Sequence, residues 1–102
     1  MHERDTEALY HVAAEFLNRE AGRQSMITVT RAHLSDDRKS GIIYISVFPD
    51  TAEESAVHFA NRNRTEFSKF FEKRVRGMQV PQVEFVIDEG EKARRRLDEL
   101  TK

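Results

Sequence analysis

Residues 51–77 read TAEESAVHFANRNRTEFSKFFEKRVRG, and this stretch does most to decide the fold. Its apolar side chains recur at the spacing of one helical face: Ala56, Ala60, Phe67 and Phe71. Asn63 falls in the middle of that face, and asparagine favours turns because its side chain competes for backbone hydrogen bonds. The sequence therefore predicts a long helix with a kink at Asn63-Arg64-Thr65, in which Thr65 caps the second segment.

The two ends of this helix also carry signals. Thr51 and Glu54 have the spacing of a capping box, so we expect the helix to begin there with an acidic first turn. The second segment is expected to run to about Arg76 and to stop at Gly77, because glycine is common just after a helix. An uninterrupted helix with a hydrogen-bonded, buried Asn63 amide remains open as the alternative.

The opposite side of this helix is basic. On a continuous helix of about 100° per residue, four cations lie within roughly 60° of one another, and His58 joins them: Arg62, Lys69, Lys73 and Arg76. With Arg64 and Arg74 there are six basic residues against two acids, Glu66 and Glu72, in the fifteen positions 62–76. Such a density is typical of a nucleic-acid contact, and a solvated amphipathic helix is the alternative interpretation.

The composition limits the possible classes of protein. A chain of 102 residues is expected to form a single domain over 1–102. It has no cysteine, which excludes disulfides and thiolate metal sites. The net charge is only -1, but residues 1–56 hold six Lys/Arg against ten Asp/Glu, and residues 57–102 hold eleven against eight. One local basic face is therefore compatible with the low net charge.

The same composition bears on location. No apolar run approaches the length of a membrane span, and Met1-His2-Glu3-Arg4-Asp5 is charged where a signal peptide is apolar. We therefore expect a cytoplasmic protein.

The rest of the chain changes its hydrophobic period several times. Helical spacing predicts a first helix over residues 5–21 with Gly22 as its stop. Two β-rich runs at 25–34 and 41–48 predict a hairpin, because the segment between them is polar and rich in turn formers. After Pro81, alternating apolar residues predict a third strand ended by Asp88-Glu89-Gly90, and a short charged helix follows at 91–100.

An enzyme is not indicated. His11, His33 and His58, with Asp36, Asp37 or Glu84, could in principle supply acid–base groups, but none has a diagnostic spacing. Metal-ligand pairs and nucleotide-binding fingerprints do not occur in the sequence. We expect no catalytic residues, no metal and no cofactor.

The order helix, strand, strand, kinked helix, strand is that of an α+β fold of the type II K-homology kind, with helices packed on one face of a three-stranded sheet. Three segments then resemble a particular family. Residues 28–37 look like its T-V-x-x-V-x-x-S-x-D-L motif, 43–48 like V-Y-V-S-x-L, and 80–88 like V-P-x-L-x-F-x-x-D. In order and spacing the chain resembles the ribosome-binding factor A family over about residues 5–100.

The resemblance implies a partner and a role. Members of this family bind the small ribosomal subunit and its ribosomal RNA, and assist late maturation near the decoding region before they are released. The family usually has Ala-x-Gly at the kink, where this chain has Asn63-Arg64-Thr65. Other K-homology domains use a Gly-x-x-Gly loop there to clamp a single strand.

Without those glycines, we expect recognition of folded RNA by shape and phosphate contacts rather than by base sequence. The predicted RNA-binding residues are Arg62, Arg64, Lys69, Lys73 and Arg76. A monomer is expected. The alternative is a K-homology-like protein-interaction module that does not bind ribosomal RNA and pairs through the open sheet face.

Several weaker candidates have ordinary explanations. The turn cations Arg31, Arg38 and Lys39 could extend the basic surface, and Arg94-Arg95-Arg96 could touch RNA, but acids surround that run: Glu89, Glu91, Asp98 and Glu99. Phe67, Phe70 and Phe71 are expected in the core rather than as base-stacking residues, and Tyr44 and Phe48 are expected to pack.

Overall fold

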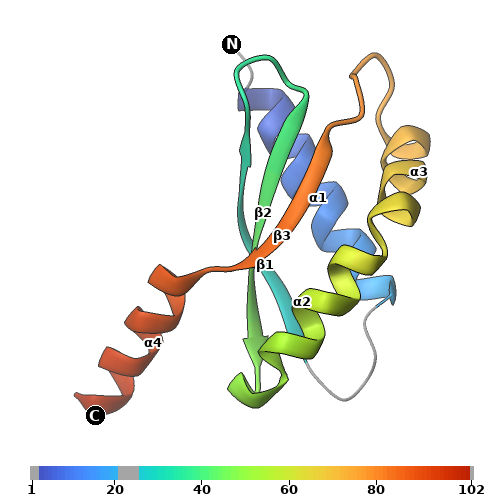
Figure 1. Ribbon diagram of the computed structural model, residues 1–102. Helices are drawn as coiled ribbons and strands as arrows, with labels where there is room; N and C mark the ends of the chain where they lie inside the picture. Colours follow the sequence, from blue (N-terminus) through green and yellow to red (C-terminus); the bar gives the residue numbers. More distant parts are fainter. Residues whose placement is uncertain (1–2, 21–25, 102) are drawn as a thin grey trace.

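A three-stranded sheet carries three helices on one face, and a fourth helix projects from its end (Figure 1). The computed structural model describes residues 3–20 and 26–101. Its elements are α1 (Glu3–Glu20), β1 (Met26–Leu34), β2 (Ser40–Phe48), a 3₁₀ turn η1 (Asp50–Ala52), α2 (Glu53–Arg62), α3 (Arg64–Arg74), β3 (Gln82–Ile87) and α4 (Glu89–Leu100). Each predicted helix and strand is present, and the α+β fold of the type II K-homology kind is confirmed. The predicted stop at Gly22 lies outside the described residues.

The sheet is mixed. β1 and β2 form the predicted antiparallel hairpin, and β3 pairs in parallel with β2 on its other side. Asp37 organises the hairpin turn, because its Oδ1 accepts hydrogen bonds from the Ser35 hydroxyl at 2.6 Å and the Lys39 amide at 3.0 Å. The Ser35 hydrogen bond is the main cause that lowers the pKa of Asp37.

Alternation along β2 separates a buried face from an open one. Ile43, Ile45 and Val47 are completely buried beneath the helices, as a period of two predicts. Phe48 lies on the other face and is 65% exposed, so the expectation that it packs is wrong. The reason is that α1, α2 and α3 all cover the opposite face, and Phe48 is the last residue of its strand.

The core joins the helices to the sheet through aromatic rings. Phe67 of α3 meets Phe16 of α1 and Phe85 of β3, with ring centroids 5.4 and 5.8 Å apart. α1 itself lies very close to β2, since a Cβ atom added to Gly41 would be only 2.9 Å from Leu9 Cδ2. The absence of a side chain at Gly41 therefore sets how near α1 can approach.

The long helix is broken at one residue. α2 ends at Arg62 and α3 begins at Arg64, so Asn63, with φ -98° and ψ 18°, is the break. The Asn63 side chain donates to the Phe59 carbonyl at 2.7 Å, which satisfies one of the last carbonyls of α2. The predicted capping role of Thr65 is wrong, because Thr65 lies within the first turn of α3.

The predicted capping box at the start of α2 is also wrong. Thr51 lies inside η1, α2 starts at Glu53, and its N-cap residue is Ala52, without a side-chain cap hydrogen bond. A 3₁₀ turn closed by the Ala52 amide donating to the Pro49 carbonyl at 2.9 Å begins the helix instead. At the other end α3 stops at Arg74, earlier than expected, and Gly77 takes a positive φ of 77° in the connection that follows.

α4 differs from the other helices in its surroundings. Asp88 caps it by accepting from the Glu91 amide at 3.0 Å, and none of its twelve residues is buried.

Among the described helices, none has the length and apolar character needed to cross a membrane.

Candidate nucleic-acid interface

The five predicted RNA-binding residues are all exposed, but they do not share one helix. Arg62 lies on α2, Arg64, Lys69 and Lys73 lie on α3, and Arg76 lies beyond the end of α3. The single stripe predicted for a continuous helix is therefore divided, because the chain changes course at Asn63. Two surface hollows are lined by different predicted residues: Lys69 and Lys73 line one, and Arg64 lines the other.

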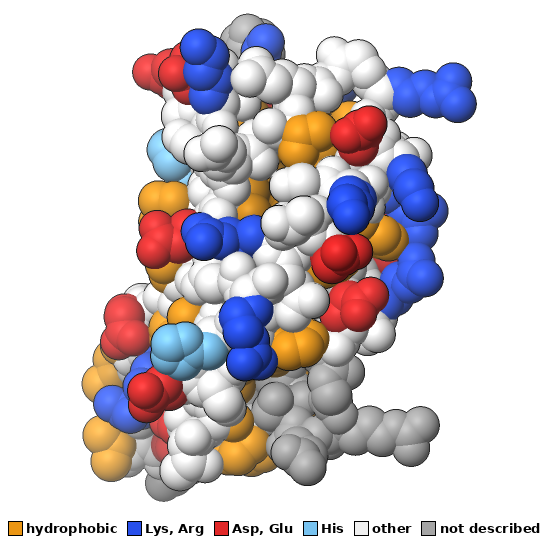
Figure 2. All heavy atoms as spheres, turned by 45° about the vertical axis from the view of Figure 1, so that its right-hand side comes forward, with side chains coloured by type: hydrophobic (Ala, Val, Ile, Leu, Met, Phe, Trp, Pro, Cys, Tyr) orange, Lys and Arg blue, Asp and Glu red, His pale blue; other side chains and the backbone are white. Residues whose placement is uncertain are grey.

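The first hollow lies between α1 and α3, and we call it the α1–α3 hollow. Its volume is about 340 Å³, and its cations are Arg19, Lys69, Lys73 and Arg74. Figure 2, which turns the α3 side of the molecule forward, shows Lys and Arg side chains gathered along one edge with acidic side chains beside them. The hollow thus brings the predicted residues Lys69 and Lys73 together with Arg19 and Arg74, which were not predicted as contacts.

Arg19 and Arg74 could not be predicted as contacts from the sequence, for different reasons. Arg19 lies far along the chain from α3 and joins it only through the packing of α1. Arg74 projects onto the apolar face of a continuous helix, but in the structure it is exposed and its Nη2 lies 3.0 Å from Glu15 Oε2. The break at Asn63 changes the register between the two segments, which a single helical projection cannot show.

The second hollow, the α3–β3 hollow, lies beside the kink. It has a volume of about 270 Å³ and is lined by Arg64, Thr65, Ser68, Gln82 and Val83. The predicted residues Arg64 and Thr65 thus face β3 rather than α1. Arg64 also donates from Nε to the Asn61 carbonyl at 3.1 Å, so part of its guanidinium is engaged with the end of α2.

Asn61 positions α2 against the free edge of β3. Its Nδ2 donates to the Phe85 carbonyl at 3.1 Å, and its Oδ1 accepts from the Phe85 amide at 3.0 Å. The Asn61 side chain thus makes the two main-chain hydrogen bonds that a residue of a further strand would make at this edge. Because main-chain N–H and C=O groups alternate in direction along a strand, those of Val83 also point to this edge, and Val83 is one of the residues that line the α3–β3 hollow. The sequence pattern singled out Asn63 and missed Asn61.

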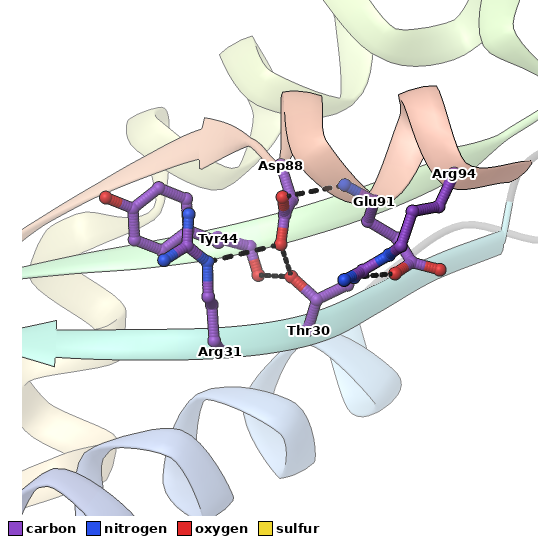
Figure 3. A network of polar contacts seen from close by, with 6 residues as sticks. All are labelled: Thr30, Arg31, Tyr44, Asp88, Glu91 and Arg94. Atoms are coloured by element: carbon purple, nitrogen blue, oxygen red, sulfur yellow. Dashed lines mark hydrogen bonds and ion pairs between the residues drawn. The ribbon is translucent and has the colours of Figure 1, made fainter.

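Asp88 is the centre of a polar network, and this network includes Arg31, one of the weaker candidates for RNA contact (Figure 3). The buried carboxylate accepts from Thr30 Oγ1 at 2.6 Å and from Arg31 Nε at 3.4 Å. The Thr30 hydrogen bond is the main cause that lowers the pKa of Asp88. A bulge between Val29 and Arg31 turns Arg31 onto the open face, where its guanidinium lies 3.9 Å from the Tyr44 ring centroid.

Four of the other weak candidates are paired within the molecule. Arg38 forms an ion pair with Asp5, and Arg94 pairs with Glu91, which raises the pKa of Arg94. Arg95 and Arg96 both reach Asp50, an acid outside the expected group. Such exposed pairs are weak, yet they lower the charge available to a polyanion.

The three histidines in the described part of the chain do not form a catalytic or metal-binding cluster. His11, His33 and His58 are all exposed and lie on different elements. Within residues 3–20 and 26–101, no group of three or more His, Asp or Glu side chains lies close enough to hold a metal ion.

A mixed three-stranded sheet, one covering helix and a second helix broken beside the free sheet edge define an α+β protein of the type II K-homology class. The family model for ribosome-binding factor A matches residues 2–101. The chain therefore belongs to the ribosome-binding factor A family.

Individual relatives are distant in sequence. Ribosome-binding factor A of Fervidobacterium nodosum is 28% identical over 78 residues, which cover 76% of this chain and only 62% of that protein. The crystal structure of ribosome-binding factor A from Thermus thermophilus is 24% identical, with a TM-score of 0.72, over 80% of this chain and 90% of that one. Coordinates of the Thermus thermophilus protein fitted into a cryo-electron microscopy map of a 30S complex give 24% identity and a TM-score of 0.71, covering 80% and 89%. The two structural comparisons establish a shared fold.

Proposed function

We propose that this protein binds the small ribosomal subunit and its ribosomal RNA, and acts as an assembly factor in late maturation of that RNA. The observation that carries the proposal is the family match over residues 2–101. The Thermus thermophilus relative fitted into a map of a 30S complex supports the same partner. In this proposal the protein works in the cytoplasm as a monomer, without a cofactor or a catalytic step.

The geometry supports a phosphate-based mode of recognition. The exposed cations of α3 lie on a helix that is anchored in the core, because Phe67 and Phe71 of α3 are completely buried. The kink carries Asn63 and not a glycine, so the close backbone approach that a glycine loop allows is absent there. Long cationic side chains can instead reach phosphates of a folded RNA.

The low net charge of the protein is compatible with binding to RNA through one local surface. Acidic residues outnumber basic ones in the first half of the chain, so the protein as a whole does not attract RNA and binding depends on the local basic surface. If four or five cations neutralise phosphates, the logarithm of affinity falls with the logarithm of salt at a slope of roughly -3 to -5.

Co-sedimentation with isolated small subunits, mature and immature, tests this proposal. We expect saturable binding that favours immature particles and weakens with salt at the slope given above. Changing Arg62, Lys69, Lys73 and Arg76 together to Glu should abolish binding, with circular dichroism unchanged because all four side chains are exposed. Failure of the unaltered protein to bind at low salt would overturn the proposal.

A second candidate is protein contact through the open sheet face. Met26 and Phe48 are paired in register on β1 and β2, and they are 67% and 65% exposed. Exposed apolar pairs of this kind suit a protein partner. Binding that survives both high salt and the four-charge variant would favour this candidate over RNA contact.

A further inference from the structure

The α1–α3 hollow holds two arginines against one aromatic ring. The guanidinium carbon of Arg74 lies 4.5 Å from the Phe70 ring centroid, and that of Arg19 lies 5.4 Å from it. Stacking on an aromatic face restrains a guanidinium and leaves N–H donors at its edge for a ligand. Phe70 itself is only partly buried, so the ring and both cations remain at the surface.

Two lysines complete the basic lining. Lys69 and Lys73 are four residues apart on α3, and both line the same hollow. Like charges at this spacing repel each other mildly on an isolated helix. The carboxylate paired with Lys69 is that of Glu66, at a long 3.9 Å between exposed side chains, so the lysine charge is weakly compensated.

Acidic side chains are present but lie unevenly. Glu15 pairs with Arg74, while Glu20 and Glu66 line the hollow. α1 and α3 are antiparallel here, since Glu15 meets the end of α3 and Arg19 meets its middle. Glu20 and Glu66 therefore lie toward one end. At the other end Glu15 pairs with Arg74, and Lys73 supplies the cationic excess.

Helix dipoles do not explain this arrangement. Each dipole favours cations in the last turn of its own helix, where Arg19, Lys73 and Arg74 lie. Because α1 and α3 are antiparallel, their last turns point to opposite ends, and dipoles alone would keep the cations of α1 apart from those of α3. Arg19 and Arg74 nevertheless meet at the Phe70 ring. The dipole also gives no reason for Lys69, which is not in the last turn of α3.

We propose that the α1–α3 hollow is a phosphate site for ribosomal RNA, in which Arg19 and Arg74 hold one phosphate group and Lys69 and Lys73 flank it. The inference rests on the proposed function and extends the contact surface from α3 to α1. The volume of about 340 Å³ is at the lower end of small-ligand sites, which suits a phosphate with part of its sugar.

The experiment compares two arginines of the same helix. Arg19→Gln removes a cation of the hollow, and Arg4→Gln removes an exposed cation near the start of α1. Binding of each full-length variant to immature small subunits is measured across a salt series. We expect Arg19→Gln to weaken binding several-fold and to make the salt slope shallower by about one, and Arg4→Gln to change neither.

A double variant tests whether the arginines share a phosphate. If they do, Arg19→Gln combined with Arg74→Gln should weaken binding by clearly less than the product of the two single effects. Independent effects would overturn the shared site. The substituted side chains are exposed, so an unchanged thermal melting curve is expected and is measured alongside.

The experiment distinguishes a failure of this phosphate-site inference from a failure of the proposed function. If the unaltered protein binds and Arg19→Gln matches Arg4→Gln, this inference alone is wrong. If the unaltered protein does not bind, the proposed function is overturned and this inference with it. Saturable binding of inorganic phosphate in the hollow, with subunit binding indifferent to Arg19→Gln, would make it a site for free anions and overturn the assignment to RNA.

Discussion

α3 and α4 are both short, charged, exposed helices, yet they are attached to the protein in opposite ways. α3 places Phe67 and Phe71 completely inside the core. α4 buries none of its residues, and its apolar side chains Leu97 and Leu100 are 61% and 81% exposed. Its attachments to the rest of the molecule are the polar contacts of Asp88 and the ion pairs to Glu53 and Asp50.

The two modes of attachment fix the charges of α3 and α4 to different degrees. A fully buried phenylalanine contributes about 1.5–3 kcal/mol through burial, and salt does not weaken that term. The exposed ion pairs of α4 to Asp50 contribute about 0–1 kcal/mol each and are screened by salt, whereas the less exposed Lys92–Glu53 pair is screened less. The helix that carries the α3 cations is therefore held in place by the core, whereas the position of α4 depends more on salt and pH.

The largest effect is expected from Phe67→Ala. The ring contacts α1 and β3 as well as its own helix, so its removal leaves a cavity at the junction of three elements. We expect a loss of about 3–5 kcal/mol in the free energy of unfolding, measured by urea denaturation. A loss below about 1 kcal/mol would show that α3 is not fixed by the core.

A smaller loss is expected from Gly41→Ala. The new Cβ would lie 2.9 Å from Leu9 Cδ2 and 3.3 Å from the His33 carbonyl oxygen, so α1 must shift. Overpacking of this kind costs about 1–3 kcal/mol, seen as a lower melting temperature. Gly90→Ala in α4 is the matched control. Its Cβ would make an ordinary 3.5 Å contact with Asp88, so no loss is expected there. Equal effects at both positions would contradict the comparison.

Asp88→Asn tests the polar attachment of α4. The pKa of Asp88 is lowered in the folded protein, chiefly by the Thr30 hydroxyl. Its stabilising effect is therefore complete above the unfolded pKa of about 3.9, and is lost as pH falls through the lower folded value. We expect the variant to lose about 1–2 kcal/mol at neutral pH and to show a smaller decline in acid than the unaltered protein. Parallel pH curves from chemical denaturation would contradict this.

The smallest effect is expected from Lys92→Ala. Lys92 Nζ lies 2.8 Å from Glu53 Oε1, and the two side chains are only 18% and 17% exposed. We expect a loss of about 1 kcal/mol, with faster amide hydrogen exchange in α4. Lys69→Ala, which removes a long and exposed ion pair on α3, should leave exchange in α3 unchanged. Faster exchange in α3 would show that its position too depends on ion pairs.

Much of the fold could be predicted because it follows from local periodicity. The alternation of Ile43, Ile45 and Val47 indicates a half-buried strand, and the misplaced Asn63 indicates a helix break. The start of α2 could not be predicted in the same way. Thr51 and Glu54 match a capping box, but a 3₁₀ turn from Pro49 takes the chain into the helix first.

The candidate site was less predictable because it depends on contacts between distant segments. The spacing of Lys69 and Lys73 shows in the sequence that they share a helical face. That Arg19 and Arg74 meet at Phe70 depends on the packing of α1 against α3, which no local pattern encodes. The same holds for Asn61, whose role appears only when β3 lies beside α2.

In the proposed function, the core-anchored face of α3 meets ribosomal RNA while α4 does not. Lysine-specific chemical labelling of the protein, free and bound to immature small subunits, tests it most directly. We predict that Lys69 and Lys73 lose reactivity on binding and that Lys92 of α4 reacts equally in both states. Unchanged reactivity of Lys69 and Lys73 in the bound protein would contradict the claim.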